Sequence, residues 1–174
     1  LPEIILGVGA LLTLMIGAFS GDRRVALYQI SAMITLAAAI AAVSASYGTQ
    51  ATAFSNTVSV DTFGSFGKIL IYAASLICIA IAPRFFGNGM RAEYPVLILF
   101  AALGMGIMVS ARDMMTLYIG LELNSLAAYV LASFMRNDDR SSEAGLKYFV
   151  LGALASGMLL YGISLLYGFS GSTQ

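Results

Sequence analysis

The chain has 174 residues, of which 59% are hydrophobic and 10% are charged, and its basic and acidic side chains cancel to a formal net charge of zero. Soluble domains carry about 25% charged residues, so this composition indicates an integral membrane protein and gives no sign of nucleic-acid binding. The absence of His and the single cysteine, Cys78, argue against a haem, iron–sulfur or zinc site and exclude a disulfide within the chain.

Six apolar segments are long enough, or nearly so, to cross a membrane, which takes about 20 residues. They are residues 4–20, 25–47, 63–82, 94–110, 114–135 and 142–169. The first segment follows no basic stretch and precedes no convincing cleavage site, so we interpret it as a retained span. The polar stretch 48–62 predicts an external loop with a short strand in residues 56–61. The sequence therefore predicts an all-α, polytopic helix bundle that forms a single domain over residues 1–174.

Basic residues are distributed unevenly between the loops. The loops after the first, third and fifth spans carry six arginines, whereas the other two loops carry only Arg112. The six are Arg23, Arg24, Arg84, Arg91, Arg136 and Arg140. Alternate loops lie on opposite sides of a membrane, and cytoplasmic loops are the richer in Lys and Arg. The pattern predicts that the arginine-rich loops are cytoplasmic and that the N-terminus is periplasmic.

One carboxylate, Glu122, lies near the middle of the fifth span. On insertion scales an acidic residue at a helix centre costs roughly 2.5–3.5 kcal/mol, so such a residue indicates a function by default. Four hydroxyls fall within about 60° of Glu122 around the helix. They belong to Tyr118, Ser125, Tyr129 and Ser133. A carboxylate beside a hydroxyl stripe that can hold water suits a proton relay; the alternative is a carboxylate that only fixes helix packing.

Lys147, near the start of the sixth span, is the second candidate. It follows Glu143 by four residues, the favourable order for a helical ion pair, and it could also extend to the membrane interface. Counted from their cytoplasmic helix ends, Lys147 and Glu122 differ in depth by roughly 10 Å, so we expect coupling through water and not direct contact. Small residues facing away from Lys147 predict a helix-packing surface. They are Gly145, Gly152 and Ser156.

The remaining polar residues of the spans lie near helix ends. We expect Lys68 and Arg112 to extend to the membrane interface, and Asp113 to cap the fifth span. Four tyrosines near span ends predict interfacial anchors. They are Tyr28, Tyr47, Tyr94 and Tyr167.

Two stretches resemble one known family. Residues 120–131, Gly-Leu-Glu-Leu-Asn-Ser-Leu-Ala-Ala-Tyr-Val-Leu, resemble the fifth helix of the antiporter-like subunits of respiratory complex I. Residues 142–168, which begin Ser-Glu-Ala-Gly-Leu-Lys-Tyr-Phe, resemble the helix that follows. This second match is long, and it favours the bacterial subunit N group over subunits L and M and over the Mrp antiporters. The first three spans fit the same group.

The resemblance implies a fold of about fourteen helices with two inverted five-helix repeats, each of which contains a broken helix. It implies that Glu122 modulates a neighbouring lysine and that Lys147 lies on a cytoplasmic half-channel. We expect this chain to be the N-terminal portion of such a fold, incomplete at its C-terminus. The lysine partner of Glu122 is then expected in a broken helix beyond Gln174.

The function that this resemblance implies is proton translocation by a membrane subunit of NADH:quinone oxidoreductase, in a bacterial inner membrane. The expected partners are the lipid bilayer and the other membrane-arm subunits, including neighbouring antiporter-like subunits. We expect no cofactor and no redox centre in this chain, with NADH, FMN, iron–sulfur clusters and quinone bound by other subunits. Two alternatives stay open: an Mrp-type cation/proton antiporter subunit, and a structural membrane-arm subunit without a proton path of its own.

Overall fold

The computed structural model describes residues 2–20, 25–54, 56–86 and 91–174. Its helices are α1 (Pro2–Ser20), α2 (Val25–Ala45), α3 (Thr62–Phe86), α4 (Glu93–Ser110), α5 (Met114–Ala132) and α6 (Asp139–Ser170). Strands β1 (Ala51–Ala53) and β2 (Val58–Val60) form an antiparallel hairpin between α2 and α3. All six helices are long and apolar enough to cross a membrane, which confirms the predicted all-α transmembrane architecture.

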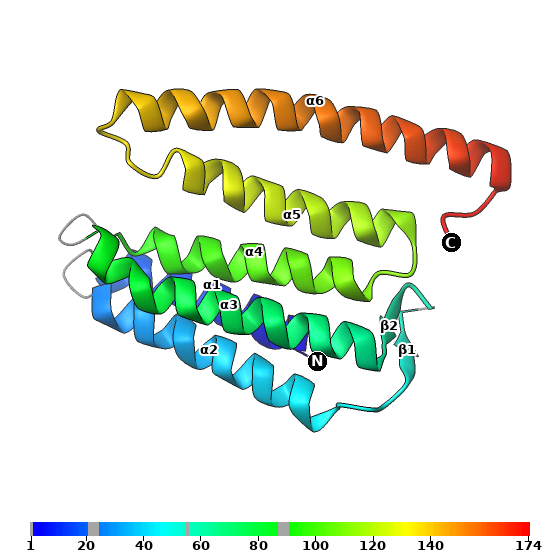
Figure 1. Ribbon diagram of the computed structural model, residues 1–174, viewed down its shortest axis with the longest axis horizontal. Coiled ribbons are helices and arrows are strands. Elements are labelled where there is room, and N and C mark those ends of the chain that lie inside the picture. Colours follow the sequence, from blue (N-terminus) through cyan, green and yellow to red (C-terminus); the bar gives the residue numbers. More distant parts are fainter. Residues whose placement is uncertain (1, 21–24, 55, 87–90) are drawn as a thin grey trace.

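The first four helices pack around a common core, and α5 and α6 extend from it as a row (Figure 1). The core contains leucines, alanines and one tyrosine, which include Leu6, Ala32, Leu36, Tyr72, Leu99 and Ala102. Helix α5 packs on α4, and α6 packs mainly on α5, so α6 lies at one edge (Figure 1). Large apolar side chains of α6 are therefore exposed over most of its surface.

The two ends of the bundle differ in charge. One end, which we call the hairpin end, carries the β1–β2 hairpin and the α4–α5 turn (Figure 1). The opposite end, which we call the arginine end, carries the α5–α6 connection and the described arginines Arg84, Arg91, Arg136 and Arg140. This is the grouping that the loop charges predict, although Arg23 and Arg24 lie outside the described residues.

Helix α3 is longer than predicted and continues through Pro83 to Phe86, past the expected end at residue 82. Proline has no N–H, so it leaves the carbonyl four residues earlier, that of Ile79, without its helical donor. The side-chain amide of Gln29 in α2 donates to the Ile79 carbonyl at 3.0 Å. A neighbouring helix thus replaces the missing hydrogen bond, which a pattern within α3 could not reveal.

The α5–α6 connection lies three residues earlier in the sequence than predicted. Helix α5 ends at Ala132, before the expected residue 135, and α6 begins at Asp139, before the expected residue 142. The earlier start of α6 follows from a cap, because the side chain of Asp138 accepts a hydrogen bond from the backbone N–H of Arg140 at 3.0 Å.

The loop before α3 is more ordered than the sequence indicates. The predicted strand in residues 56–61 is β2, and β1 pairs with it. The expectation that Arg112 only extends to the interface is incomplete. Arg112 is exposed, but its guanidinium donates to Asn56 at 2.6 Å and its backbone N–H donates to the Thr57 carbonyl at 2.9 Å. These bonds tie the hairpin to the α4–α5 turn.

The prediction that Tyr28 is an interfacial anchor is wrong. Its side chain is fully buried, because it lies on the inner face of α2 together with Ala32, Leu36, Ala39 and Val43. Tyr47 and Tyr167 are about half exposed, as expected near span ends. Tyr94 is half-buried at the arginine end, where its ring packs edge-on against Phe86 and Phe134.

Candidate functional site

Glu122 lies at mid-depth in the bundle. Helix α5 begins after Asp113, whose side chain accepts a hydrogen bond from the backbone N–H of Thr116, so the predicted cap is confirmed. Eight residues separate Glu122 from the first residue of α5 and ten from the last. At 1.5 Å per residue these separations place the carboxylate about 12 Å and 15 Å from the two helix ends. Water from either side of the membrane must therefore travel along several helical turns of α5 to reach the carboxylate.

Two glycines fix how α5 is rotated against α4. A Cβ added at Gly104 would lie 2.6 Å from the backbone of Gly120 and of Asn124, and a Cβ at Gly120 would lie 2.9 Å from the Gly104 carbonyl. The two backbones are thus in direct contact, which only residues without side chains permit. Glu122 follows Gly120 by two residues, about 200° around the helix, and so it faces away from α4.

The opposite face of α5 contacts the small residues of α6, as predicted. A Cβ at Gly145 would overlap Ser133, and a Cβ at Gly152 would overlap the ring and hydroxyl of Tyr129. Ser156, further along the same face, donates its hydroxyl to the carboxylate of Glu122. From the sequence we predicted only a packing role for Ser156. The other two residues of this face are glycines, so Ser156 provides its only polar side chain.

The hydroxyl stripe is present on α5, but it does not form a continuous hydrogen-bonded chain. Tyr129 is buried over Gly152 and packs edge-on against Tyr148, with ring centroids 4.8 Å apart. Among the described residues, no hydrogen bond joins Glu122 to Tyr118, Ser125 or Tyr129. The direct partner of Glu122 is therefore a hydroxyl of the next helix.

Two clefts flank the Glu122–Ser156 contact along the α5–α6 interface. The cleft towards the arginine end has a volume of about 670 Å³, and Tyr129 and Ser133 line it. The cleft towards the hairpin end has a volume of about 570 Å³, and Tyr118 lines it with apolar residues of α6. Three hydroxyls of the predicted stripe thus lie in clefts on the two sides of the carboxylate.

Lys147 lies on the outer face of α6, away from this contact. Its side chain is 70% exposed, and it pairs with Glu143 four residues earlier, as the spacing predicts. Nine residues separate Lys147 from Ser156, which is about 14 Å along the helix axis. This separation is larger than the roughly 10 Å expected from the sequence, and the structure does not bring Lys147 and Glu122 together.

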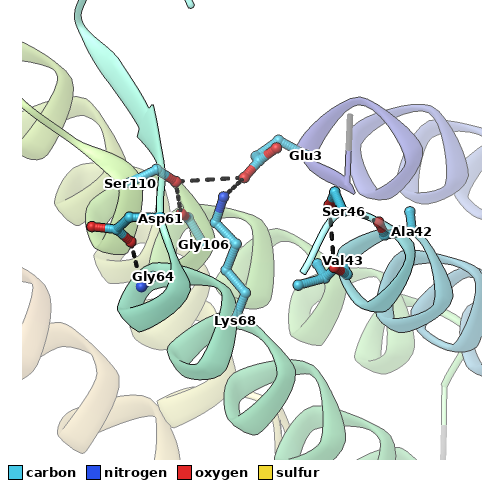
Figure 2. Close-up of polar contacts among 9 residues, drawn as sticks. All are labelled: Glu3, Ala42, Val43, Ser46, Asp61, Gly64, Lys68, Gly106 and Ser110. Carbon is cyan, nitrogen blue, oxygen red and sulfur yellow. Dashed lines mark hydrogen bonds and ion pairs between the residues drawn. The ribbon is translucent and has the colours of Figure 1, made fainter. Parts of the chain in front are cut away.

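The sequence did not reveal a buried ion pair near the hairpin end. Lys68 was expected to extend to the interface, but its residue is only 4% exposed and its ammonium pairs with the carboxylate of Glu3 (Figure 2). Glu3 stands at the start of α1, 65 positions away in the sequence. The available signal was that Lys68 shares one helix face with Ser65, Tyr72 and Ser75, which made an inward orientation of this face possible.

Residues 111–174 match the family model described as the transmembrane domain of NADH:quinone oxidoreductases and Mrp antiporters. The curated NADH-quinone oxidoreductase subunit N of Sphingopyxis alaskensis is 75% identical to this chain over 173 residues, which are 99% of this chain and 36% of that protein. This chain belongs to the subunit N family. It spans about 36% of the length of the curated relatives that it matches.

Solved structures show the same fold. A chain of respiratory complex I from Thermus thermophilus with bound aureothin matches with a TM-score of 0.85 and 31% identity, over 99% of this chain and 38% of that chain. A chain of the Mrp complex from Dietzia sp. DQ12-45-1b matches with a TM-score of 0.81 and 21% identity, over 99% of this chain and 35% of that chain. The two folds are alike, so sequence identity, and not shape, separates this chain from the Mrp antiporters.

Proposed function

We propose that this chain contributes the Glu122 proton site to a proton-translocating membrane subunit of bacterial NADH-quinone oxidoreductase. The observation that carries the proposal is the contact between Glu122 and Ser156 at mid-depth, with a cleft on each side that at least one hydroxyl of α5 lines. A buried carboxylate needs a partner or a function. Here the described partner is one neutral hydroxyl, which leaves the carboxylate able to take up a proton.

Protonation of Glu122 would change the bond that joins α5 and α6. The ionised carboxylate only accepts hydrogen bonds, so Ser156 must donate to it. The carboxylic acid carries a proton of its own and can donate, and Ser156 must then reorient or accept. Arrival of a cation near Glu122 favours the ionised form, and its departure favours the protonated form. A lysine elsewhere in the subunit could therefore control the proton on Glu122.

Lys147 is proposed to exchange protons on the arginine side of the same path. Its ammonium is exposed on α6 and its described partner, Glu143, is also exposed. The family resemblance supports this role, and the separation of about 14 Å from the level of Glu122 requires that water carry the proton between them. The hydroxyls of Tyr129 and Ser133 line the cleft on the arginine side of Glu122.

The loop charges support an orientation in the bacterial inner membrane. The arginine end is proposed to face the cytoplasm, which places the N-terminus and the hairpin end in the periplasm. The proposed partners are the other membrane-arm subunits, including neighbouring antiporter-like subunits, together with lipid. NADH, FMN, iron–sulfur clusters and quinone are proposed to bind to other subunits, and the energy of quinone reduction would reach Glu122 through the local electric field.

The test replaces Glu122 by Gln in the full-length subunit within the assembled complex. Gln keeps the size and a hydrogen-bond acceptor for Ser156 but cannot carry a proton. We expect a complex that assembles but loses most of its proton pumping, measured as acidification of proteoliposomes during NADH:quinone turnover. The matched control is Asp139→Asn, which changes an exposed carboxylate at the first residue of α6, outside the cleft that Tyr129 lines.

Assembled Glu122→Gln complex with wild-type pumping and turnover would overturn the proton-site proposal and leave a structural role. Sodium- or potassium-coupled transport without quinone-linked turnover would instead favour the Mrp-type alternative, which the shared fold permits.

A further inference from the structure

Three helices converge on a polar cluster below the hairpin end. It contains Lys68 from the second turn of α3, Glu3 from the first turn of α1 and Ser110, the last residue of α4 (Figure 2). The ammonium of Lys68 pairs with Oε1 of Glu3, and the Ser110 hydroxyl lies 3.5 Å from the same oxygen. The Ser110 hydroxyl also donates to the Gly106 carbonyl at 2.7 Å.

The burial of this pair is not explained by stability alone. The Lys68 side chain is 6% exposed and that of Glu3 is 22% exposed, whereas the Glu143–Lys147 pair is mostly exposed. Removing two charges from water costs about as much as their attraction returns, so an apolar pair of similar volume is often as stable or more stable. Ionisable residues inside a membrane bundle indicate a function by default.

A buried tyrosine extends the cluster towards the membrane centre. Tyr72 follows Lys68 by one turn on the inner face of α3 and is fully buried. Among the described residues, its hydroxyl has no hydrogen-bond partner. The hydroxyl lies beside Gly106, because a Cβ added to that glycine would be 2.5 Å from the hydroxyl oxygen. The hydroxyl is also close enough to Glu3 to interact with it electrostatically. A buried hydroxyl of this kind is normally satisfied by water.

The cluster also lies close to a polar cleft at the surface of the hairpin end. That cleft has a volume of about 540 Å³, and polar side chains that include Asp61 and Arg112 line it. The Asp61 side chain accepts from the backbone N–H of Gly64 at 2.6 Å, in the first turn of α3 (Figure 2). Lys68 follows Gly64 by one helical turn and lies about 9 Å along the helix axis from the first residue of α3. A proton from the hairpin side therefore has a short distance to cover.

We propose that Glu3, Lys68, Tyr72 and Ser110 form a second proton-exchange site, which binds water between the Tyr72 hydroxyl and the Glu3–Lys68 pair. A hydronium ion gives its proton to the Glu3 carboxylate, which becomes a carboxylic acid, and a neutral water molecule remains. Lys68 keeps its three protons, and Ser110, Tyr72 and the bound water then solvate its ammonium. Release of the proton from Glu3 to water restores the ion pair. The site exchanges protons with the hairpin side and does not require Glu122.

The experiment is the double substitution Glu3→Gln with Lys68→Met in the full-length subunit of the assembled complex. Both charges are removed together, so no unpaired charge stays buried. We expect normal assembly and NADH:quinone turnover, with a several-fold fall in protons moved per NADH oxidised. The control, Asp139→Asn with Arg140→Met, removes one exposed charge of each sign at the arginine end, outside the cleft that Tyr129 lines, and should keep the wild-type yield. An assembled double variant with a wild-type yield would show that the pair is structural and would overturn the proposal.

Tyr72→Phe decides the question if the double variant does not assemble. It removes one hydroxyl and keeps the buried ring, and we expect a measurable fall in proton yield with normal assembly. An unchanged yield in that variant would reject the site. The proposal rests on the proposed function only for its pumping readout. Wild-type pumping in Glu122→Gln would refute the proposed function. This site alone would be refuted if Glu122→Gln loses pumping while the Glu3, Lys68 and Tyr72 variants keep the wild-type yield.

Discussion

Two carboxylates of the spanning helices, Glu3 and Glu122, have opposite surroundings. Glu3 lies in a closed four-helix bundle, and Lys68 from the same chain neutralises it. Glu122 lies between α5 and α6 at the open edge of the molecule, and Ser156 offers it a neutral hydroxyl. The first carboxylate has its counter-charge within the described residues, whereas no described cation pairs with the second.

This difference shows that depth along a helix and burial in the bundle are separate quantities. Glu122 is eight and ten residues from the two ends of its helix and is half-buried, while Lys68 is near the start of α3 and almost fully buried. A residue near a helix end can still face the interior when three helices converge there. Burial depends on which neighbours cover a face, and depth depends only on position in the span.

The largest expected effect comes from breaking the interface that joins the two regions. Gly104→Ala adds a methyl group against the backbone of α5, which cannot move aside as a flexible side chain would. Overpacking of this kind costs typically about 1–3 kcal/mol. We expect a lower thermal midpoint and less assembled complex, measured by unfolding of the purified complex and by native gel analysis.

The control for this substitution is Gly157→Ala in α6. No described atom lies within 4 Å of a Cβ at Gly157, and Ala favours helix by about 1 kcal/mol relative to Gly. Equal losses of stability in both variants would contradict the view that α4 and α5 are joined by backbone contact at Gly104.

A smaller effect is expected from Ser156→Ala, which tests the hydroxyl that distinguishes the Glu122 region. Ala fits the small-residue face of α6, so packing should be kept, but Glu122 loses its described donor. A hydrogen bond to a charged group contributes about 1.5–3 kcal/mol. We expect several-fold slower proton pumping with normal assembly, a smaller loss than in Glu122→Gln.

Ser164→Ala is the matched control, because the exposed Ser164 hydroxyl donates only to the Tyr161 carbonyl within α6. Wild-type pumping in Ser156→Ala would mean that the contact positions the helices and does not tune the proton on Glu122.

Local patterns predicted what depends on one helix at a time. The six spans follow from apolar length, the Asp113 cap from its position before α5, and the glycine face of α6 from its spacing. Glu122 stood out because a charge within an apolar helix is rare. These features can be predicted without knowing which helix packs against which.

Contacts between distant segments could not be predicted in the same way. The extension of α3 past Pro83 depends on Gln29, which is 50 positions from the Ile79 carbonyl that it donates to, and the burial of Lys68 depends on Glu3. The Ser156 bond to Glu122 joins residues 34 positions apart. In each case the energetic cost was visible in the sequence, as a lost donor or an unpaired charge, but the group that offsets it lies on another helix.

The smallest structural effect is expected from Lys147→Ala. Exposed ion pairs such as Glu143–Lys147 contribute about 0–1 kcal/mol, so assembly should be unaffected. If Lys147 exchanges protons on the arginine side, its loss lowers quinone-linked turnover and pumping together, whereas Glu143→Gln, which breaks the same pair but keeps the ammonium, has the weaker effect. Unchanged turnover in Lys147→Ala would make this residue an interfacial anchor. The only proton sites proposed for the described residues would then be Glu122 and the buried Glu3–Lys68 cluster.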